Sequence, residues 1–314
     1  MNMPTTSIAI PCYNSEGSIG RAVESALQQT VSTAEVIVVD DGSTDNSLAV
    51  LRRFGNRIRL IEADHRGGNH ARNLALESAT GEWIQFLDAD DYLLKDKITR
   101  QLEEGGDTSS VDILYSPVLV EENRNGSEPN IMVQAIDTGL DLYGQWIAWH
   151  LPQTGAALWR RESLVSLGGW NERMPCCQEH ELYLRALIKG LRFRMTPTAR
   201  AVYRIWSEKT VCRRDPEQLI KIRTGLIDLM CNWLKENGKW KLQHSRTAGR
   251  ICFEMARGMA KSDIRKALNY HDERRARGLI HLAGPAAPIR YRIAYSALGF
   301  RGAENLARMQ RRSP

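Results

Sequence analysis

The chain has 314 residues and a formal net charge of +6, with 42% hydrophobic and 25% charged residues. This length and balance are ordinary for a soluble globular protein with a sizeable core, in one large or two medium domains. No apolar run approaches the roughly 20 residues that span a bilayer, and the start "MNMPTTSIAI" lacks the pattern of a signal peptide. We therefore expect a cytoplasmic protein, soluble or peripheral at the inner face of the membrane.

The charge is unevenly spread along the chain. Residues 1–200 hold 19 lysines and arginines against 27 aspartates and glutamates, whereas residues 201–314 hold 24 against 10. We expect the acidic part to hold the chemistry and the basic part to face an anionic partner or solvent.

Strand and helix signals alternate through the first 115 residues. Apolar runs that are bounded by turn residues are typical of strands in a parallel sheet. They predict strands over residues 7–13, 34–41, 57–63, 82–89 and 111–118, with helices between them. This alternation predicts βαβ units, and hence an α/β fold with a mostly parallel sheet flanked by helices.

The pattern changes in the second half of the chain. Residues 119–140 are irregular, with a surface hairpin at 121–130, and helices are predicted at 139–150 and 178–190 before a strand at 199–206. Apolar periodicity then predicts helices over residues 216–237, 243–261, 263–276 and 288–309. The change near residues 208–215 predicts two domains, at residues 1–210 and 211–314.

Six cysteines occur, at positions 12, 176, 177, 212, 231 and 252. None forms a C-x-x-C pair, and no metal-ligand spacing is present. We expect free thiols, as in a reducing cytosol.

Three aspartates follow the fourth predicted strand, in "WIQFLDADDYL". Close carboxylates resist ionising together unless a cation or several donors lie among them. Because residues two apart at a strand end point the same way, Asp88 and Asp90 would face one crevice at the edge of the sheet where such folds bind ligands. Their oxygens suit Mg²⁺ or Mn²⁺ bridged to phosphate. The alternative is an acidic turn that caps the next helix without a metal.

Polar groups also follow two other predicted strands. In "VVDDGSTD", an Asx turn and a helix cap explain the serine and threonine but not the doubled Asp40 and Asp41. A carboxylate there would accept from a base N–H or a ribose hydroxyl. In "IPCYN", Tyr13 would either stack on a base or pack against the protein. Three strand ends with convergent polar groups indicate a nucleotide site more strongly than any one of them.

Four ordered blocks carry a resemblance to a known family: "SIAIPCYNSEGSIGRAVESALQQT", "EVIVVDDGSTDNS", "GGNHARNLALESATGEWIQFLDADD" and "QEHELYLRAL". Over roughly residues 5–205 the chain resembles a family 2 glycosyltransferase with a GT-A fold. The resemblance implies a Rossmann-like sheet, followed here by a C-terminal helical extension. It also implies transfer of a sugar from a nucleotide diphosphate sugar to an acceptor hydroxyl.

The resemblance implies roles for particular residues in donor binding. Asp90 would be the direct metal ligand of a D-x-D motif, and Asp88 would lie near the ribose and the metal. The remaining donor-side residues would be Pro11, Tyr13 and Asn14, with Asp41 toward the base, and Arg72 and Asn73 on the helix that borders the pocket. UDP-sugars are favoured, and GDP or dTDP donors stay open.

The catalytic base is implied by the fourth block. The family usually has Glu-Asp seven and six residues before the arginine of "LRL", and this chain has Gln178 and Glu179 there. Glu179 would deprotonate the acceptor in a single displacement that inverts the anomeric centre. Glu181 is the reserve candidate, and His180 is a neighbour on the acceptor side.

The acceptor side would also include Trp159 and Trp170, whose rings could stack on sugars or be part of the core. The acceptor would be a saccharide or a lipid-linked saccharide, in polysaccharide or glycolipid assembly.

The basic region after residue 210 admits three functions: peripheral contact with an anionic membrane, a partner or oligomer interface, or a solvated helical cap. We expect the membrane contact. The rival classes are nucleotidyl transfer to a sugar phosphate, an inactive nucleotide-sugar-binding relative and a nucleic-acid binder. "PCYNSEG" has no basic glycine-rich loop for a triphosphate, and no nucleic-acid module is evident, so we expect no nucleic-acid partner.

Overall fold

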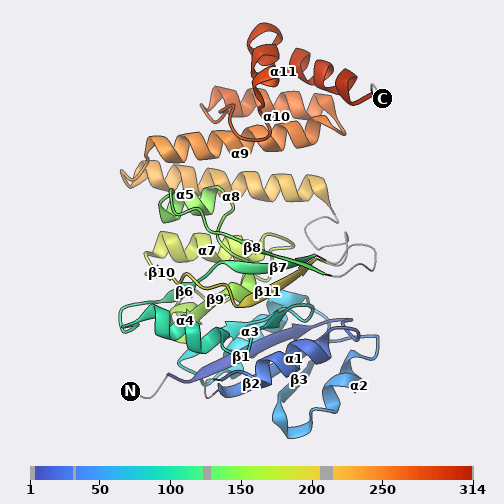
Figure 1. Cartoon of the computed structure of the whole chain (residues 1–314), viewed down its shortest axis with the longest axis vertical. Helices are drawn as coiled ribbons and strands as arrows, with labels where there is room; N and C mark the ends of the chain where they lie inside the picture. The colour runs from blue at the N-terminus through green and yellow to red at the C-terminus, as the bar shows by residue number, and fades with distance from the viewer. Residues whose placement is uncertain (1–3, 31–32, 123–128, 206–214, 313–314) are drawn as a thin grey trace. The chain divides into compact units, whose positions relative to one another are not determined.

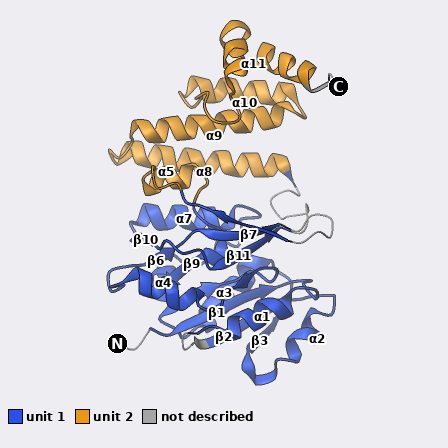
Figure 2. Ribbon diagram, in the orientation of Figure 1, with its two compact units in different colours: residues 1–136, 151–215 blue, residues 137–150, 216–314 orange. Residues whose placement is uncertain are grey.

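The computed structural model describes residues 4–30, 33–122, 129–205 and 215–312. The chain forms two compact units, one of residues 1–136 with 151–215 and the other of residues 137–150 with 216–314 (Figure 2). The predicted domain boundary at residue 210 and most of the predicted hairpin at 121–130 lie outside the described residues. The predicted division into 1–210 and 211–314 stays a prediction.

A seven-stranded sheet forms the centre of the first unit, with strand order β10-β6-β9-β4-β1-β2-β3 (Figure 1). β1 lies between β2 and β4, and it pairs in parallel with both. In chain order the strands are β1 (Thr6–Cys12), β2 (Thr33–Asp41), β3 (Arg59–Ala63), β4 (Trp83–Phe86), β6 (Ile113–Tyr115), β9 (Ala157–Arg160) and β10 (Phe193–Met195). The expectation of a mostly parallel sheet is confirmed, because only β9 runs antiparallel to its neighbours.

The sheet is buried because its strands are apolar on both faces. Ile8, Ala9 and Ile10 of β1 and Ile37, Val38 and Val39 of β2 are shielded from solvent almost completely. The helices of this unit are α1 (Ile19–Leu27), α2 (Ser47–Arg52), α3 (Gly68–Ser78), α4 (Lys97–Gly105), α6 (Arg161–Ser166) and α7 (Gln178–Lys189), with short 3₁₀ turns at Gly55–Arg57 and Thr154–Ala156. Since β1, β2, β3 and β4 are parallel, the loops after their last residues meet at one edge of the sheet.

Two features of this unit were not predicted. The run at residues 111–118 contains β6 and the start of a second strand, β7 (Val118–Glu122), because Ser116 and Pro117 break it. β7 belongs to a four-stranded sheet of order β5-β11-β7-β8. The other strands of that sheet are β5 (Tyr92–Leu93), β8 (Asn130–Gln134) and β11 (Ala201–Ile205).

The second unit is helical. It contains α5 (Leu142–Ile147), α8 (Pro216–Glu236), α9 (Leu242–Ala260), α10 (Ile264–Ala276) and α11 (Ile289–Arg312), the last kinked at Gly299. Asp141 caps α5 and also contacts His244 of α9, at 2.9 Å from its Nε2. The helix predicted at 139–150 therefore belongs with the later helices, although 65 residues separate it from α8.

The described helices and cysteines bear on two further expectations from the sequence. None of the described helices is long and apolar enough to cross a membrane. The five described cysteines are buried, and none of them is in a disulfide, which agrees with the expected thiols; Cys212 lies outside the described residues.

Candidate functional site

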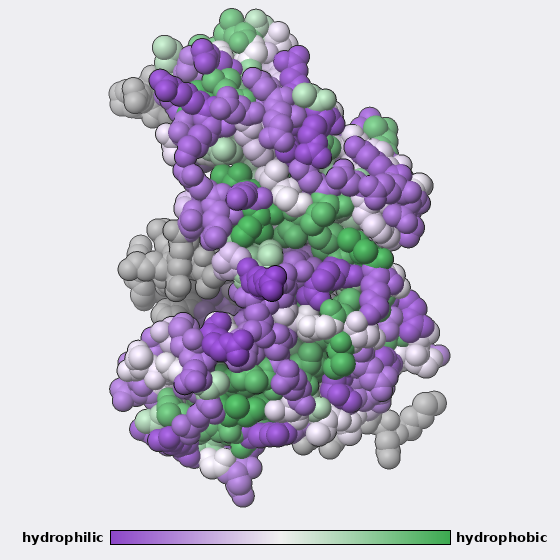
Figure 3. All heavy atoms as spheres, turned by 180° about the vertical axis from the view of Figure 1, so that it is seen from behind, coloured by the Kyte–Doolittle hydropathy of each residue, from purple (hydrophilic) through white to green (hydrophobic). Residues whose placement is uncertain are grey.

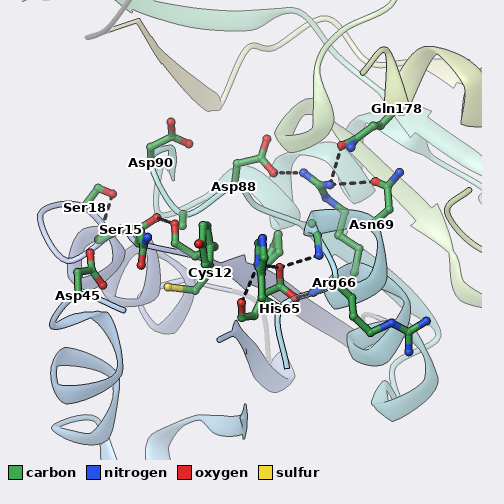
Figure 4. A pocket seen from close by; sticks show the side chains of 18 of the residues that line it. Cys12, Ser15, Ser18, Asp45, His65, Arg66, Asn69, Asp88, Asp90 and Gln178 are labelled. Carbon is green, nitrogen blue, oxygen red and sulfur yellow. Dashed lines mark hydrogen bonds and ion pairs between the residues drawn. The ribbon is translucent and has the colours of Figure 1, made fainter. Parts of the chain in front are cut away.

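A cavity of about 900 Å³ opens in the first unit where β1, β2 and β4 end. The strand-end loops and the start of α7 form its walls, and Figure 4 shows their side chains converging on one space. Its lining comprises residues 11–18, Asp41, Asp45, residues 65–69, Arg72, residues 88–90, Glu172, Met174, Pro175 and Gln178. Most of the residues predicted for donor binding, namely Pro11, Tyr13, Asn14, Asp41, Arg72, Asp88 and Asp90, are among them.

An aromatic pair forms one part of the cavity wall. The ring of Tyr13 stacks on the ring of His65, with centroids 4.0 Å apart and planes at 21°. The Tyr13 side chain is 42% exposed, so one ring face is available to a planar ligand. Sequence reasoning missed His65. The one feature of the sequence that could have indicated His65 is its position, two residues after the third predicted strand.

Asp41 shapes the loop that carries His65. Its buried carboxylate accepts from the backbone N–H groups of Arg66 and Gly67, both at 2.9 Å, and lies 2.9 Å from Nδ1 of His65. Gly42 has φ +70, and a Cβ there would lie 2.9 Å from the backbone nitrogen of His65. Asp41 thus holds the 65–67 loop against the end of β2, and a contact from Asp41 to a base stays a prediction.

Asn14 joins the loops that follow β1 and β2. It has φ +47, in the left-handed region that asparagine tolerates. Its Oδ1 accepts from the N–H of Thr44 at 2.8 Å, and its own N–H donates to the hydroxyl of Ser43 at 3.1 Å. Asn14 therefore fixes the floor of the cavity beside Tyr13.

The three aspartates lie in a turn and not on a strand, because β4 already ends at Phe86. The alternation argument for Asp88 and Asp90 is therefore wrong in its geometry, although both residues line the cavity (Figure 4). Asp91 turns inward, where it accepts from the N–H of Arg204 and from Gln153, both at 2.8 Å. Burial, and then the charges of Asp88 and Asp90, raise the pKa of Asp91 well above its ordinary value.

Arg72 links this turn to α7. Its Nη2 donates to Asp88 at 2.6 Å, and its Nη1 donates to the side-chain oxygens of Asn69 and Gln178, both at 3.2 Å. The guanidinium also lies 4.7 Å from the ring centroid of Trp170. A buried, multiply held cation of this kind fixes the carboxylate of Asp88 in one orientation.

Asn73 does not line the cavity, which corrects the prediction of a donor-side contact. Its amide nitrogen donates to the carbonyl of Trp170 at 2.9 Å and to Glu172 at 3.0 Å, and its Oδ1 accepts from the N–H of Trp170. Asn73 holds the chain before α7 against α3, behind the cavity wall.

The two tryptophans predicted for the acceptor side belong to the core. Trp159 is 3% exposed and stacks on Tyr183 at 5.6 Å, because β9 is inserted between β4 and β6. Trp170 is also 3% exposed, and its ring lies nearly perpendicular to that of Phe86, with centroids 5.2 Å apart. The prediction that these rings stack on a sugar is wrong, because neither face is open. His180 is buried as well, so the prediction of an acceptor-side contact from it is also wrong.

The two glutamates of α7 differ in their surroundings. Glu179 is half-buried, and it accepts a hydrogen bond from the Thr154 hydroxyl at 2.9 Å. Glu181 is buried and forms a two-point ion pair with Arg185, at 2.8 and 2.9 Å. Since both oxygens of Glu181 are held by this pair, Glu179 is the better placed of the two to accept a proton.

Tyr203 of β11 lies near several carboxylates whose charges affect its pKa. Burial raises the pKa of its phenol, and nearby carboxylates raise it further, to about 12. Those carboxylates are Asp91, Asp90, Asp88 and Glu179. Because Glu179 and the three aspartates all affect the pKa of Tyr203, the charge of Glu179 lies near the aspartate turn. Glu179 does not line the cavity.

Asp88 and Asp90 are the cavity carboxylates predicted to hold a divalent ion. Across the described part of the chain, no group of three His, Cys, Asp or Glu side chains is arranged to hold a metal. Mg²⁺ and ions like it are commonly held by one or two protein carboxylates together with substrate phosphates and water. Asp88 and Asp90, which both line the cavity, match that smaller set of protein ligands.

The sequence matches known proteins across its first half. Residues 7–167 match a family model described as "Glycosyl transferase family 2". An uncharacterized glycosyltransferase of Haemophilus influenzae is 40% identical over 106 residues, 32% of this chain and 42% of that protein. A UDP-Glc:alpha-D-GlcNAc-diphosphoundecaprenol beta-1,3-glucosyltransferase of Escherichia coli is 38% identical over 123 residues, 38% of this chain and 49% of that protein. The chain thus spans less than half the length of these curated relatives.

Two solved structures share the fold at low identity. S. aureus TarS 1-349 in complex with UDP-GlcNAc has a TM-score of 0.67 at 18% identity, covering 98% of this chain and 92% of that one. A mannosyltransferase from Pyrobaculum calidifontis in complex with GDP-Man and Mn²⁺ has a TM-score of 0.54 at 17% identity, covering 99% and 88%.

Proposed function

We propose that this chain, which belongs to glycosyl transferase family 2, transfers a sugar from a nucleotide diphosphate sugar to an acceptor hydroxyl. The fold is the expected GT-A fold with helices at its C-terminal side. One observation carries the proposal: the lining of a single cavity of about 900 Å³ includes a stacked aromatic pair, Tyr13 and His65, together with Asp88 and Asp90. A nucleotide base would stack on the aromatic pair, and a diphosphate with its metal ion would bind at the aspartates.

The donor is best described as a UDP-sugar. The exposed face of Tyr13 suits a flat pyrimidine, and Asp41 and Asn14 hold the loops on either side of it. The structurally similar TarS was solved with UDP-GlcNAc, which is consistent with this choice at the level of the fold.

Asp90, supported by Asp88, would hold the divalent ion, Mn²⁺ or Mg²⁺. Such an ion neutralises the negative charge that grows on a leaving diphosphate. Arg72 holds Asp88 in one orientation by donating to it at 2.6 Å. The chain's own contribution would thus be two carboxylates in the cavity lining, of which Asp88 is held in place by Arg72.

Glu179 is the proposed general base. It would take the proton from the acceptor hydroxyl, while Thr154, 2.9 Å away, restrains one of its oxygens. If Glu179 only deprotonates the acceptor and does not itself bond to the sugar, the displacement is single and the anomeric configuration would invert. Base assistance of this kind contributes roughly a hundredfold to ten-thousandfold in rate.

The acceptor is proposed to be a saccharide or lipid-linked saccharide in polysaccharide or glycolipid assembly. The matching E. coli glucosyltransferase, whose name specifies a diphosphoundecaprenol-linked acceptor, supports this class. We propose that the sugar transfer takes place in the cytoplasm, at the inner face of the membrane.

Isothermal calorimetry with a panel of UDP-, GDP- and dTDP-sugars tests the proposal, each titrated with and without Mn²⁺. We expect one UDP-sugar to bind only when the metal is present, and Asp90→Ala to lose that binding while its thermal unfolding stays near that of the wild type. Exposed Asp107→Ala, on the loop after α4, is the matched control. A wild-type chain that binds no nucleotide sugar, or an Asp90→Ala chain that binds and transfers normally, would overturn it.

A further inference from the structure

Helix α11 in the second unit leaves several large apolar side chains exposed to solvent, on both sides of its kink at Gly299. Figure 3 shows hydrophobic atoms on the surface over α11, among polar ones. These side chains are Ile289, Ile293, Leu298, Leu306 and Met309, and Ile289 and Ile293 are 73% and 65% exposed. Exposed apolar groups gathered on one helix are typical of an interaction surface.

The opposite side of α11 is fixed to its neighbours. The Tyr291 hydroxyl donates to Glu304 at 2.8 Å, and Arg257 of α9 donates to the same carboxylate at 2.6 Å. Tyr295 is 2.8 Å from Nε2 of His271 on α10. Since these buried polar contacts set the rotation of the helix, its outward face is well defined.

The outward face combines an apolar stripe with arginines on both sides. Ile289, Ile293 and Ala297 are four residues apart and so lie on one line along the helix. Each residue of an α-helix turns the chain by about 100°, which places Arg290 on one side of this stripe and Arg292 on the other. Both arginines are exposed. Long cationic side chains beside an apolar stripe can keep their charged ends in a polar layer while the stripe itself is buried.

The charge of α11 indicates what kind of surface would cover it. Residues 289–312 contain six arginines and one acidic residue, Glu304, which faces inward and is paired with Arg257. In a symmetric contact between two copies, the flanking arginines would meet arginines of the partner and repel. A layer of negatively charged groups that covers hydrocarbon matches both the arginines and the apolar stripe of this face.

We propose that α11 docks this chain on an anionic phospholipid surface. Ile289 and Ile293 enter the boundary between headgroups and acyl chains, and Arg290 and Arg292 contact the lipid phosphates. The inference rests on the proposed function and deepens it, because it names α11 as the element that brings the enzyme to a lipid-linked acceptor. Its test does not involve sugar transfer.

Vesicle flotation of the full chain tests the proposal, with phosphatidylcholine vesicles that either contain or lack phosphatidylglycerol. We expect binding to the anionic vesicles only, and weaker binding as salt rises. The double variant Ile289→Ser/Ile293→Ser should bind roughly tenfold more weakly or worse, because burial of each isoleucine is lost. Arg290→Gln and Arg292→Gln should each cost about fivefold. The matched control is Leu229→Ser, because Leu229 on α8 of the same unit is 58% exposed and lies outside the stripe.

Three outcomes would overturn the proposal. One is a wild-type chain that does not float with anionic vesicles or floats equally with neutral ones. Another is a double variant that binds as the wild type does, with circular dichroism showing that both are folded. The third is a dimer, seen by sedimentation velocity, that the double variant loses while vesicle binding is absent throughout. Calorimetry of donor binding on the same samples separates this proposal from the proposed function, since either can fail while the other stands.

Discussion

Nη2 of Arg72 on α3 lies 2.6 Å from a carboxylate oxygen of Asp88, in the turn after β4. The same guanidinium donates from Nη1 to Gln178, at the start of α7. Because Glu179 is the next residue along that helix, one buried cation sets the spacing between the proposed metal-side carboxylate and the proposed base. Both sides of the reaction depend on this single side chain.

Arg72→Lys should therefore lower kcat/KM by roughly tenfold to a hundredfold, the usual cost of losing a group that orients a metal ligand. Lysine carries the charge but not the planar fork that reaches Asp88 and Gln178 together. Steady-state kinetics over a range of Mn²⁺ concentrations would show a raised metal requirement. Arg100→Lys, on the exposed side of α4, is the control, and equal loss in both variants would contradict the role.

Tyr13→Ala should weaken donor binding roughly tenfold, because a base that stacks on an aromatic ring gains about 1–3 kcal/mol. Tyr13→Phe should bind nearly as well as the wild type, since the ring face is kept. Calorimetry with the UDP-sugar and with UDP alone measures both. If UDP binding is unchanged in Tyr13→Ala, the base lies elsewhere in the cavity.

The carboxylates of this site could be predicted from sequence because each follows an apolar run that had to be a strand. Asp41, Asp88 and Asp90 reach the same sheet edge for that reason. His65 could not be found in this way. It reaches Tyr13 because Asp41 captures the N–H groups of Arg66 and Gly67, a contact between residues 25 and 26 positions apart.

The errors have a common physical cause, which is pairing between distant segments. Trp159 looked available to a sugar because nothing nearby in sequence showed that β9 would be inserted between β4 and β6. The helix at 139–150 is correct as a helix, but its place beside α9 depends on the contact of Asp141 with His244, 103 residues later. Local patterns fix the elements, and these long-range contacts decide which faces are buried.

The two glutamates of α7 should respond differently to the same substitution. Glu179→Gln should bind donor normally and transfer slowly, by roughly a hundredfold or more, because the acceptor proton has no base. Glu181→Gln should transfer normally when folded but lose on the order of 2 kcal/mol of stability, since Arg185 loses a charged partner. Single-turnover rates and urea unfolding separate the two effects. A slow Glu181→Gln with an unaffected Glu179→Gln would reverse the assignment.

Acid should destabilise the first unit partly through Asp112. Burial acts to raise the pKa of this carboxyl, but hydrogen bonds from Arg192 and Ser163 and the charge of Arg192 outweigh it and lower the pKa to about 2. An aspartate in an unfolded chain titrates near a pKa of about 4. Because the folded value is the lower one, the stabilisation is fully present above about pH 4 and is lost as the pH falls toward 2.

Asp112→Asn should therefore be less stable than the wild type at neutral pH by about 1 to 2 kcal/mol. The lower end of that range allows for solvent screening, because Arg192 is largely exposed. The difference should shrink steadily between about pH 4 and pH 2, since the wild-type carboxyl becomes protonated there. Urea unfolding at a series of pH values measures it, with the exposed Glu103→Gln on α4 as control. A difference that stays constant down to pH 2 would mean that the contacts of Asp112 stabilise through packing and not through its charge.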